Sequence, residues 1–537
     1  MARVVVALIV ATAVARVALT YSVFSSTCDE WMHVTAGYEW LSRGTYTIEA
    51  QHPPLARVSV AFPLFLEGRP RDFAGGIFNG GGGYLRSVTL ARLGVLPYLV
   101  LLLTIVWLWA RDLFGRAAAL WSTAIASSLP PLLGHAGVAT TDLPFTALLF
   151  ASLYAWRRFL VVPSRGRALV LGLLAGAAFG AKFSFVPFFP LGALGVLLCE
   201  RPLAWTPRVR GLVLASMVAF LTLWSLYRFS FGPLASIADY QRFDDAPLFR
   251  DYAFARELLA AGGTIPIPAP ELLAGLLDVL MHGMIGHDSY LFGIVSPKGF
   301  WYYFPVAIGL KTPLAFLLLV TIAGIELARR FSAHPGAAGP LLSAGLILAG
   351  SMGSPIDIGI RHVLIVYPLA AVATGWAVLA WWRSGRAKRA VAAVLMGGLA
   401  VTTTAAHPDY LAWFNTLAGD DPARCLLDSN LDWGQDVLRL ARVVRCRGIE
   451  SIAVATAGNA SPELLGIPIV QADLDRPVFG WVAASDTFRF GQDPFVKMYW
   501  LRAYRPVQRI GRSIGLYYIP GPGERGARPP ERPDCEN

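Results

Sequence analysis

The stretch VVVALIVATAVARVALTYSVFSSTCDEWMH, residues 4–33, joins an apolar run to an adjacent acidic pair. Residues 4–24 are long enough to cross a bilayer as a helix, which takes about 20 apolar residues. Asp29 and Glu30 follow closely, and paired carboxylates are costly at a membrane surface unless they face water, a partner or a substrate. The stretch therefore predicts a membrane helix with chemistry at its outer end.

Composition extends this prediction to the whole chain. Of its 537 residues, 55% are hydrophobic and 15% are charged, and the mean hydropathy is +0.52. Soluble domains average about 25% charged residues, so the sequence predicts an α-helical polytopic membrane protein. The net charge of +11 comes from arginines in short loops, which is the positive-inside pattern rather than a nucleic-acid footprint.

Eleven apolar segments are candidate spans, and their odd number places the two termini on opposite sides of the membrane. The segments are 4–24, 88–110, 117–134, 143–162, 168–182, 185–199, 211–232, 303–326, 338–355, 363–382 and 390–406. Basic clusters mark every second loop as cytoplasmic. They contain Arg111, Arg116, Arg157, Arg158, Arg165, Arg167, Arg201, Arg208, Arg210, Arg329, Arg330, Arg383, Arg386, Lys388 and Arg389. We expect a multi-pass cell-membrane protein with a cytoplasmic N-terminus, and we interpret the first segment as a retained helix rather than a signal peptide.

Three parts of the chain are expected outside the membrane. Loops 25–87 and 233–302 interrupt a transmembrane domain over residues 1–406, and residues 407–537 are long enough to form an extracytoplasmic domain. Patterning in that tail predicts strands at 425–427, 451–455 and 516–519 and a helix at 435–444, which together favour a small α/β module. The expected fold is thus about 11 membrane helices with a C-terminal α/β domain.

Cysteine and acidic patterns give no metal site. The five cysteines lack metal-ligand spacing. Cys425 and Cys446 both fall in the expected outer domain, where an oxidising compartment could join them, but we favour the absence of this disulfide. Asp428, Asn430 and Asp432 alternate as in a calcium loop, but such a loop needs glycine at its sixth position and an acid at its twelfth. This chain has Trp433 and Arg439 there, so helix capping by Asp432 is preferred. The sequence requires no cofactor and leaves a divalent cation open.

Polar residues gather on the predicted outer face. Taken singly, each has an ordinary explanation as an interfacial anchor, a hydrogen-bonded histidine or a helix cap. Together they suit a reaction in which carboxylates activate a hydroxyl and cations hold an anionic leaving group. The predicted catalytic residues are Asp29, Glu30 and Asp142. The predicted substrate-binding residues are His33, His52, Arg92, His135, Lys182, His287, Lys311, Arg361 and His362.

A lipid-linked sugar phosphate fits this set. Its phosphate lies at the interface, where arginine and lysine bind it, and its tail lies in the bilayer. The anomeric carbon passes through an oxocarbenium-like state, and a carboxylate on the opposite face activates the incoming nucleophile in inverting sugar chemistry.

The order of several motifs resembles the GT-C type polyprenyl-phosphate-dependent glycosyltransferases, which include the family 39 protein O-mannosyltransferases and the bacterial aminoarabinose transferases of lipid A. The similarity extends over nearly the whole chain. The first outer loop carries Asp29-Glu30, Gly37-Tyr38, Gly44-Thr45-Tyr46 and His52-Pro53-Pro54-Leu55. Further matches are Ala91-Arg92-Leu93, Thr140-Thr141-Asp142-Leu143-Pro144, Lys311-Thr312-Pro313-Leu314, Gly359-Ile360-Arg361-His362 and Leu427–Asp436.

The resemblance implies a role for each matching residue. Asp29 would be the base that activates the acceptor, Glu30 and Asp142 would support the acceptor or sugar, and Arg92 would contact the lipid phosphate. Aminoarabinose transferases carry lysine where this chain has His52. Phosphate contact, metal binding and a purely structural turn therefore all stay open for that histidine.

The function expected from the sequence is transfer of a sugar from a polyprenyl-phosphate donor to an acceptor hydroxyl at the extracytoplasmic face, with inversion. The acceptor would be a lipid, a glycan or a protein, and nucleic acid is not expected. The alternative is a polytopic transporter or flippase of a lipid-linked or small polar substrate. Transporters usually show internal repeats with broken helices at matching positions, and this chain shows no such pairing.

Overall fold

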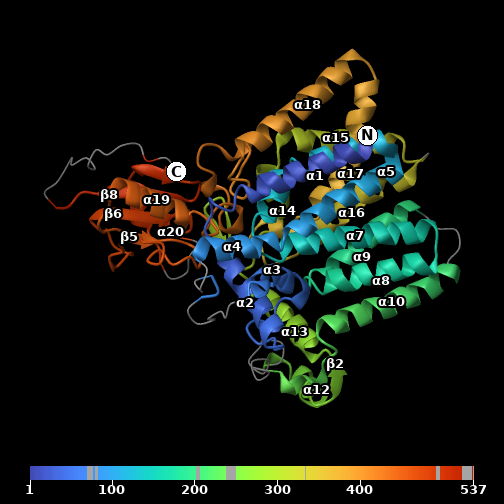
Figure 1. Cartoon of the computed structure of the whole chain (residues 1–537), viewed down its shortest axis with the longest axis horizontal. Coiled ribbons are helices and arrows are strands. Elements are labelled where there is room, and N and C mark those ends of the chain that lie inside the picture. The colour runs from blue at the N-terminus through green and yellow to red at the C-terminus, as the bar shows by residue number, and fades with distance from the viewer. Residues whose placement is uncertain are drawn as a thin grey trace.

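The computed structural model describes residues 1–68, 76–78, 83–200, 206–237, 250–332, 334–491, 496–522 and 535. A bundle of long helices forms one part of the molecule, and a small module containing a sheet forms the other (Figure 1). Arg201, one of the predicted cytoplasmic arginines, lies outside the described residues. The bundle helices are α1 (Ala2–Ala18), α5 (Leu96–Ala126), α7 (Asp142–Val161), α8 (Arg165–Phe179), α9 (Phe185–Glu200), α10 (Thr206–Leu226), α14 (Tyr303–Lys311), α15 (Leu314–Arg329), α16 (Gly339–Ser351), α17 (Val366–Arg383) and α18 (Arg386–Ala405).

The centre of the bundle is the packing of α17 along α5, with α7 beside them. A Cβ on Gly375 of α17 would lie 2.2 Å from the backbone nitrogen of Ser122 in α5, so only glycine permits this approach. α5 itself is kinked at Gly115, where φ is 85° and ψ is 174°. The kink separates the region of the predicted span 88–110 from that of 117–134.

The number of membrane spans is only partly settled. Among the described residues, two helical stretches are by themselves long and apolar enough to cross a membrane, Tyr84–Ala126 and Arg208–Leu226. The bent pair α14–α15 makes a third when it is taken as one span. The count of eleven spans therefore stays a prediction.

The predicted span 303–326 is not one continuous helix, because α14 and α15 meet at an angle of 116°. Thr312 between them is extended, with φ −106° and ψ 136°. Pro313 follows it, and proline has no backbone N–H to donate and disfavours the helical conformation of the preceding residue. The bend places Lys311 at the C-terminal end of a short helix.

Short helices and hairpins form the segments that the sequence predicts as outer loops. The first loop contains α2 (Cys28–Ser42), α3 (Pro54–Leu66) and the start of α4 (Tyr84–Leu93), and α6 (Pro130–Ala136) precedes α7. The second loop contains β1 (Phe231–Pro233), α12 (Ala253–Gly263), β2 (Pro266–Pro268), α13 (Pro270–Ile285), β3 (Ser289–Leu291) and β4 (Ile294–Ser296). β1 pairs with β2 and β3 with β4, both antiparallel.

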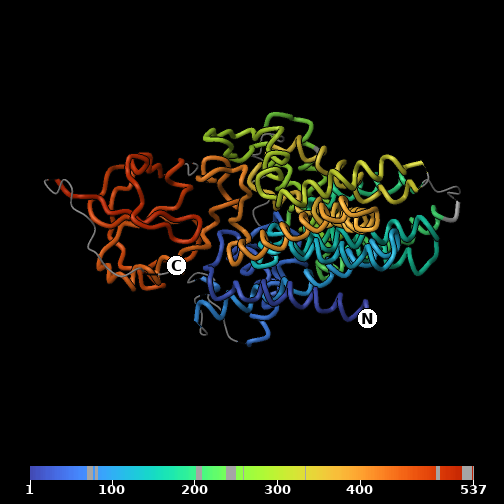
Figure 2. The backbone as a smooth tube through the Cα atoms, turned by 90° about the horizontal axis from the view of Figure 1, so that it is seen from above, coloured from blue at the N-terminus to red at the C-terminus, as the bar shows by residue number. Residues whose placement is uncertain are grey.

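The C-terminal module is a four-stranded mixed sheet with helices, and it extends away from the bundle (Figure 2). Its strands are β5 (Ala453–Ala455), β6 (Gly480–Ser485), β7 (Gln508–Ile510) and β8 (Ile514–Ile519), in the order β5-β6-β8-β7. Only β5 and β6 are parallel. α19 (Val437–Arg447) packs its apolar face on the sheet, and α20 (Asp486–Phe490) follows β6. The module's own core begins at Val437, whereas Tyr410, Ala418 and Leu426 pack with the bundle.

One prediction for the tail is wrong, and the prediction against a Cys425–Cys446 disulfide is confirmed. The expected strand 425–427 is a turn between two 3₁₀ helices, Pro422–Arg424 and Asp428–Asn430, because its apolar residues pack singly instead of forming a ladder. Cys425 is a free thiol, and Cys446 instead forms a disulfide with Cys535, a pairing that was not predicted from the sequence. The expected helix at 435–444 and the strands at 451–455 and 516–519 are confirmed as α19, β5 and β8.

Candidate active site

Glu30 and Arg92 form a fully buried ion pair. Arg92 Nε donates to Glu30 Oε1 at 2.8 Å, and Nη2 donates to Oε2 at 2.9 Å. The same carboxylate accepts the backbone N–H groups of Thr27, which caps the N-terminus of α2, and of Ala139, both at 2.7 Å. The remaining donors of Arg92 reach the carbonyl oxygens of Phe24 and Ser25. The pair therefore ties α4, the start of α2 and the turn before α7 together.

Asp29, one residue earlier, faces a different environment. Its side chain is 31% exposed, and it accepts a hydrogen bond from Nη1 of Arg361. The same nitrogen lies 3.9 Å from Oδ2 of Asp142 at the start of α7. Asp142 is buried and accepts from Lys182 Nζ at 2.6 Å and from Thr140 Oγ1 at 3.1 Å. Two carboxylates and two cations thus alternate in one array, which we call the Asp29–Lys182 array.

Three buried nitrogens beside this array have no hydrogen-bond partner among the described residues. They are Nε of Arg361, Nδ1 of His135 and Nε2 of His362. Both histidines interact electrostatically with Asp142. Buried polar atoms in proteins are nearly always satisfied, and an exception calls for an explanation such as a missing ligand. The array is therefore suited to receive a polar or anionic group.

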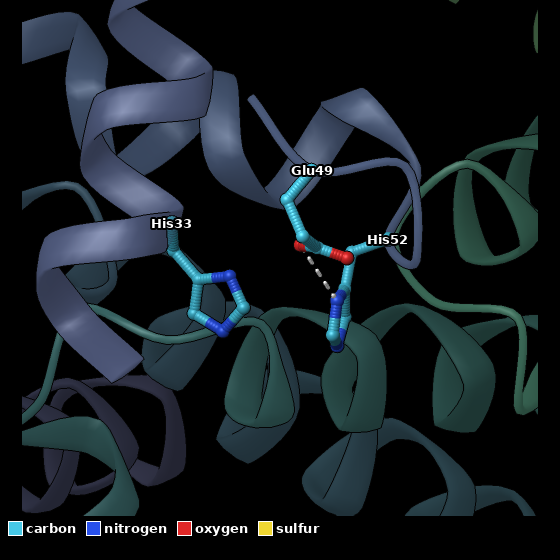
Figure 3. Close-up of side chains that lie close together, drawn as sticks. All are labelled: His33, Glu49 and His52. Atoms are coloured by element: carbon cyan, nitrogen blue, oxygen red, sulfur yellow. Dashed lines mark hydrogen bonds and ion pairs between the residues drawn. The ribbon is translucent and has the colours of Figure 1, made fainter. Parts of the chain in front are cut away.

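His33 and His52 lie together beside Glu49 (Figure 3), with ring centroids 4.8 Å apart. Burial lowers the pKa of His52 to about 3 and holds the pKa of His33 well below its usual value, so both rings are neutral. Candidate ligand atoms of the three residues lie within 4.8 Å of one another. However, Arg57 pairs with Glu49 and donates from Nε to His33 Nδ1 at 3.3 Å. Its guanidinium occupies the position of a cation, so we assign no metal centre here.

Sequence reasoning missed Arg57 and Glu49. Arg57 is fully buried in α3, and a charge within the apolar run 54–66 was an available signal. Its guanidinium also donates to the Tyr46 hydroxyl at 3.1 Å and to the Glu49 carbonyl oxygen. These contacts fix the turn that carries His52.

Like Arg92, two further predicted substrate-binding residues have their hydrogen bonds outside the Asp29–Lys182 array. Lys311 is buried, donates to the carbonyl oxygens of Leu411 and Asn430, and lies 4.1 Å from the ring centroid of Phe414. It therefore connects the bend after α14 to the tail. His287 contacts the Asp288 carbonyl oxygen and the ring of His282 in the second outer loop.

Residues 87–227 match the family model described as dolichyl-phosphate-mannose-protein mannosyltransferase. ArnT from Cupriavidus metallidurans bound to undecaprenyl phosphate is structurally similar, with a TM-score of 0.50 at 15% identity over 96% of this chain and 99% of that chain. Its apo state gives 0.50 at 14% identity over the same shares. The apo oligosaccharyltransferase of Archaeoglobus fulgidus gives 0.46 at 14% identity over 81% of this chain and 58% of that one. No curated protein matches the chain by sequence.

The matched segment contains Arg92, His135, Asp142 and Lys182. The chain shares the overall fold of ArnT, and residues 87–227 within that fold are similar to the mannosyltransferase family model. This similarity favours the glycosyltransferase expectation over the transporter alternative.

Proposed function

We propose that the protein transfers a sugar from a polyprenyl-phosphate donor to an acceptor hydroxyl, with inversion at the anomeric carbon. The observation that carries the proposal is the Asp29–Lys182 array with three unpartnered buried nitrogens beside it. If the carboxylates and cations served only to pair with one another, no buried nitrogen beside them would lack a hydrogen-bond partner. A phosphate oxygen supplies the acceptors that they lack.

Asp29 is the proposed general base. It is the more exposed of the two carboxylates in the array, so an acceptor can reach it from water. The acceptor O–H transfers its proton to Asp29 as the oxygen bonds to the anomeric carbon. The bond from that carbon to the phosphate oxygen breaks, and polyprenyl phosphate leaves as an anion.

Arg361 and Lys182 are the proposed phosphate ligands, supported by His135 and His362. Asp142 lies between the two cations and holds them in place when no donor is bound. A phosphate then shares the cations with Asp142 instead of meeting isolated buried charges, which would be costly. His33 and His52 would line the adjoining sugar pocket, because Lys182 and Asp142 both act electrostatically on His52.

In this proposal three charged residues position the segments around the site without contacting the substrates. They are Glu30, Arg92 and Lys311. Each is buried with its charged group bonded to the protein, so we prefer these roles to direct contact with the acceptor or the phosphate. His287 would lie at the acceptor side of the site.

We further propose the eleven-span topology, with a cytoplasmic N-terminus and residues 407–537 outside the cell membrane. The Cys446–Cys535 disulfide supports it, because disulfides form and persist in oxidising compartments. The acceptor would be a lipid, glycan or protein that approaches from that side.

The test is mass spectrometry of lipid-linked and surface glycans in cells that carry wild-type protein, Asp29→Asn or Asp473→Asn. Loss of a general base is typically worth about 10²–10⁴-fold in rate, so Asp29→Asn should deplete one glycan and accumulate its lipid-linked sugar. Asp473, whose side chain is 62% exposed in the C-terminal module, is the matched control and should behave as wild type. Normal glycans with inserted Asp29→Asn protein would contradict the assignment. If a labelled substrate crosses the bilayer and no new glycosidic bond forms, the transporter alternative is restored.

A further inference from the structure

The segment LDSNLDWGQDV, residues 427–437, lies against the array although it belongs to the C-terminal part of the chain. On one side it holds the stretch that leads to Asp29. The carbonyl oxygen of Trp433 accepts the backbone N–H of Cys28 at 2.9 Å, and that of Gln435 accepts the N–H of Ser25 at 3.0 Å. Asp29 is therefore fixed on this segment through its own neighbour.

On the other side the segment holds the stretch that leads to Arg361. Asn430 Oδ1 accepts the backbone N–H of Ile360 at 3.1 Å, and Ser429 Oγ donates to the Ile358 carbonyl oxygen. A Cβ on Gly359, whose φ is 155°, would lie 2.1 Å from Ser429 Oγ. Only glycine allows this close approach. Both partners of the Asp29–Arg361 ion pair are thus anchored on residues 429–435.

Trp433 also contacts the array directly. The guanidinium carbon of Arg361 lies 4.4 Å from the centroid of the Trp433 ring, and the indole is 4% exposed. The ring of His135 approaches the same indole edge-on, with centroids 6.2 Å apart. A guanidinium over an indole face is attracted by the ring quadrupole. The contact fixes the plane of the guanidinium whose Nη1 faces Asp29 and Asp142.

The backbone at Asp428 is strained, with φ at 54°. Non-glycine residues in this conformation persist only where surrounding structure imposes it, and they cluster at functional sites. The Asp428 carboxylate is half-buried and acts electrostatically on Arg361. Asp428 therefore belongs to the same charge network as Asp29.

We infer that Trp433 is a positioning residue of the transfer reaction, whose indole face holds the Arg361 guanidinium between Asp29 and Asp142. The 427–437 segment thereby completes the active site from the C-terminal part of the chain. The inference rests on the proposed function, since it assigns the indole a role in binding the donor phosphate through Arg361.

The experiment compares Trp433→Leu, Trp433→Phe and Trp481→Leu in the full-length protein. Trp481 lies in β6 of the C-terminal module against Tyr518 and serves as the matched control. A desolvated cation–π contact is worth about 2 kcal/mol or more, which corresponds to about 30-fold in affinity or rate. We expect Trp433→Leu to lower kcat/KM for the lipid-linked donor by about 10- to 30-fold. Trp433→Phe keeps an aromatic face and should recover most of the loss, and Trp481→Leu should equal wild type.

Binding of polyprenyl phosphate alone, followed by native mass spectrometry, is the second readout because it needs no turnover. Trp433→Leu should weaken this binding by a similar factor at a temperature where a melting curve in detergent shows the variant fully folded. Wild-type affinity for polyprenyl phosphate in Trp433→Leu would overturn the inference, and so would a Trp433→Phe protein as impaired as Trp433→Leu. A wild-type protein that binds the lipid but transfers no sugar would overturn the proposed function instead, and the binding comparison would still decide the role of Trp433.

Discussion

Replacement of Arg92 tests whether this residue forms a structural ion pair with Glu30 or binds the donor phosphate. Arg92→Lys keeps the charge but replaces a planar fork by a single ammonium. In the structure the guanidinium reaches both carboxylate oxygens of Glu30 and the carbonyl oxygens of Phe24 and Ser25. One ammonium cannot occupy all these directions from the end of a lysine chain, so at least one charge-assisted hydrogen bond is lost, at about 1.5–3 kcal/mol.

Arg92→Met should cost more, because it leaves the Glu30 carboxylate buried without a cation. Removal of one partner of a buried pair costs about 3–5 kcal/mol. Arg476 is the control, since its side chain is 83% exposed and its partner Asp473 is 62% exposed. A surface pair contributes about 0–1 kcal/mol, so Arg476→Met should change stability little.

The assay is unfolding by SDS titration in detergent micelles, together with the affinity of the folded protein for polyprenyl phosphate. We expect stability to fall in the order wild type, Arg476→Met, Arg92→Lys, Arg92→Met, with the lipid affinity of folded Arg92→Lys unchanged. An Arg92→Lys protein of full stability that has lost its lipid affinity would refute the positioning role and restore the contact with phosphate expected from the sequence.

Three further predictions concern pH, the disulfide and topology. Burial lowers the pKa of His52 to about 3, whereas an unfolded histidine titrates near about 6.5. As pH falls below about 6.5, the unfolded state therefore binds a proton that the folded state does not, and stability declines. Thermal melts between pH 7 and 4 should show a shallower decline for His52→Gln than for wild type. An equally steep decline would contradict a buried neutral ring. The Cys446–Cys535 bridge should stabilise the C-terminal module by about 2–4 kcal/mol. Cys535→Ser should therefore increase protease cleavage of that module while α5 stays intact. Unchanged cleavage would argue against the bridge. In a background without native cysteines, a membrane-impermeant thiol reagent should label a cysteine at Ser461 but not at Ser384 on intact cells or spheroplasts, and the reverse pattern would place Asp29 in the cytoplasm.

The sequence alone determined the class of fold and the segments that carry the site. Apolar runs and arginine-rich loops depend on local composition, so they predict helices and their order without tertiary information. The motifs containing Asp29, Asp142 and Arg361 were also recognisable, because each is short and contiguous. The sheet was only partly predictable, since β6 has no strong strand pattern. β6 pairs with β8, and the register of the pair runs from Gly480 opposite Ile519 to Ser485 opposite Ile514.

Only the tertiary structure decided how charges are shared among these segments. Glu30 and Asp29 are adjacent in the chain, yet Glu30 pairs with Arg92 and Asp29 pairs with Arg361, which is 332 residues away. Adjacent residues on a helix point in different directions, about 100° apart at 3.6 residues per turn, and which partner each one meets depends on helices that pack from distant parts of the chain. The same reason hid the contact of Trp433 with Arg361 and the partner of Cys446. Residue type and local pattern specify what a side chain is able to bind, and the packing of the whole chain selects what it does bind.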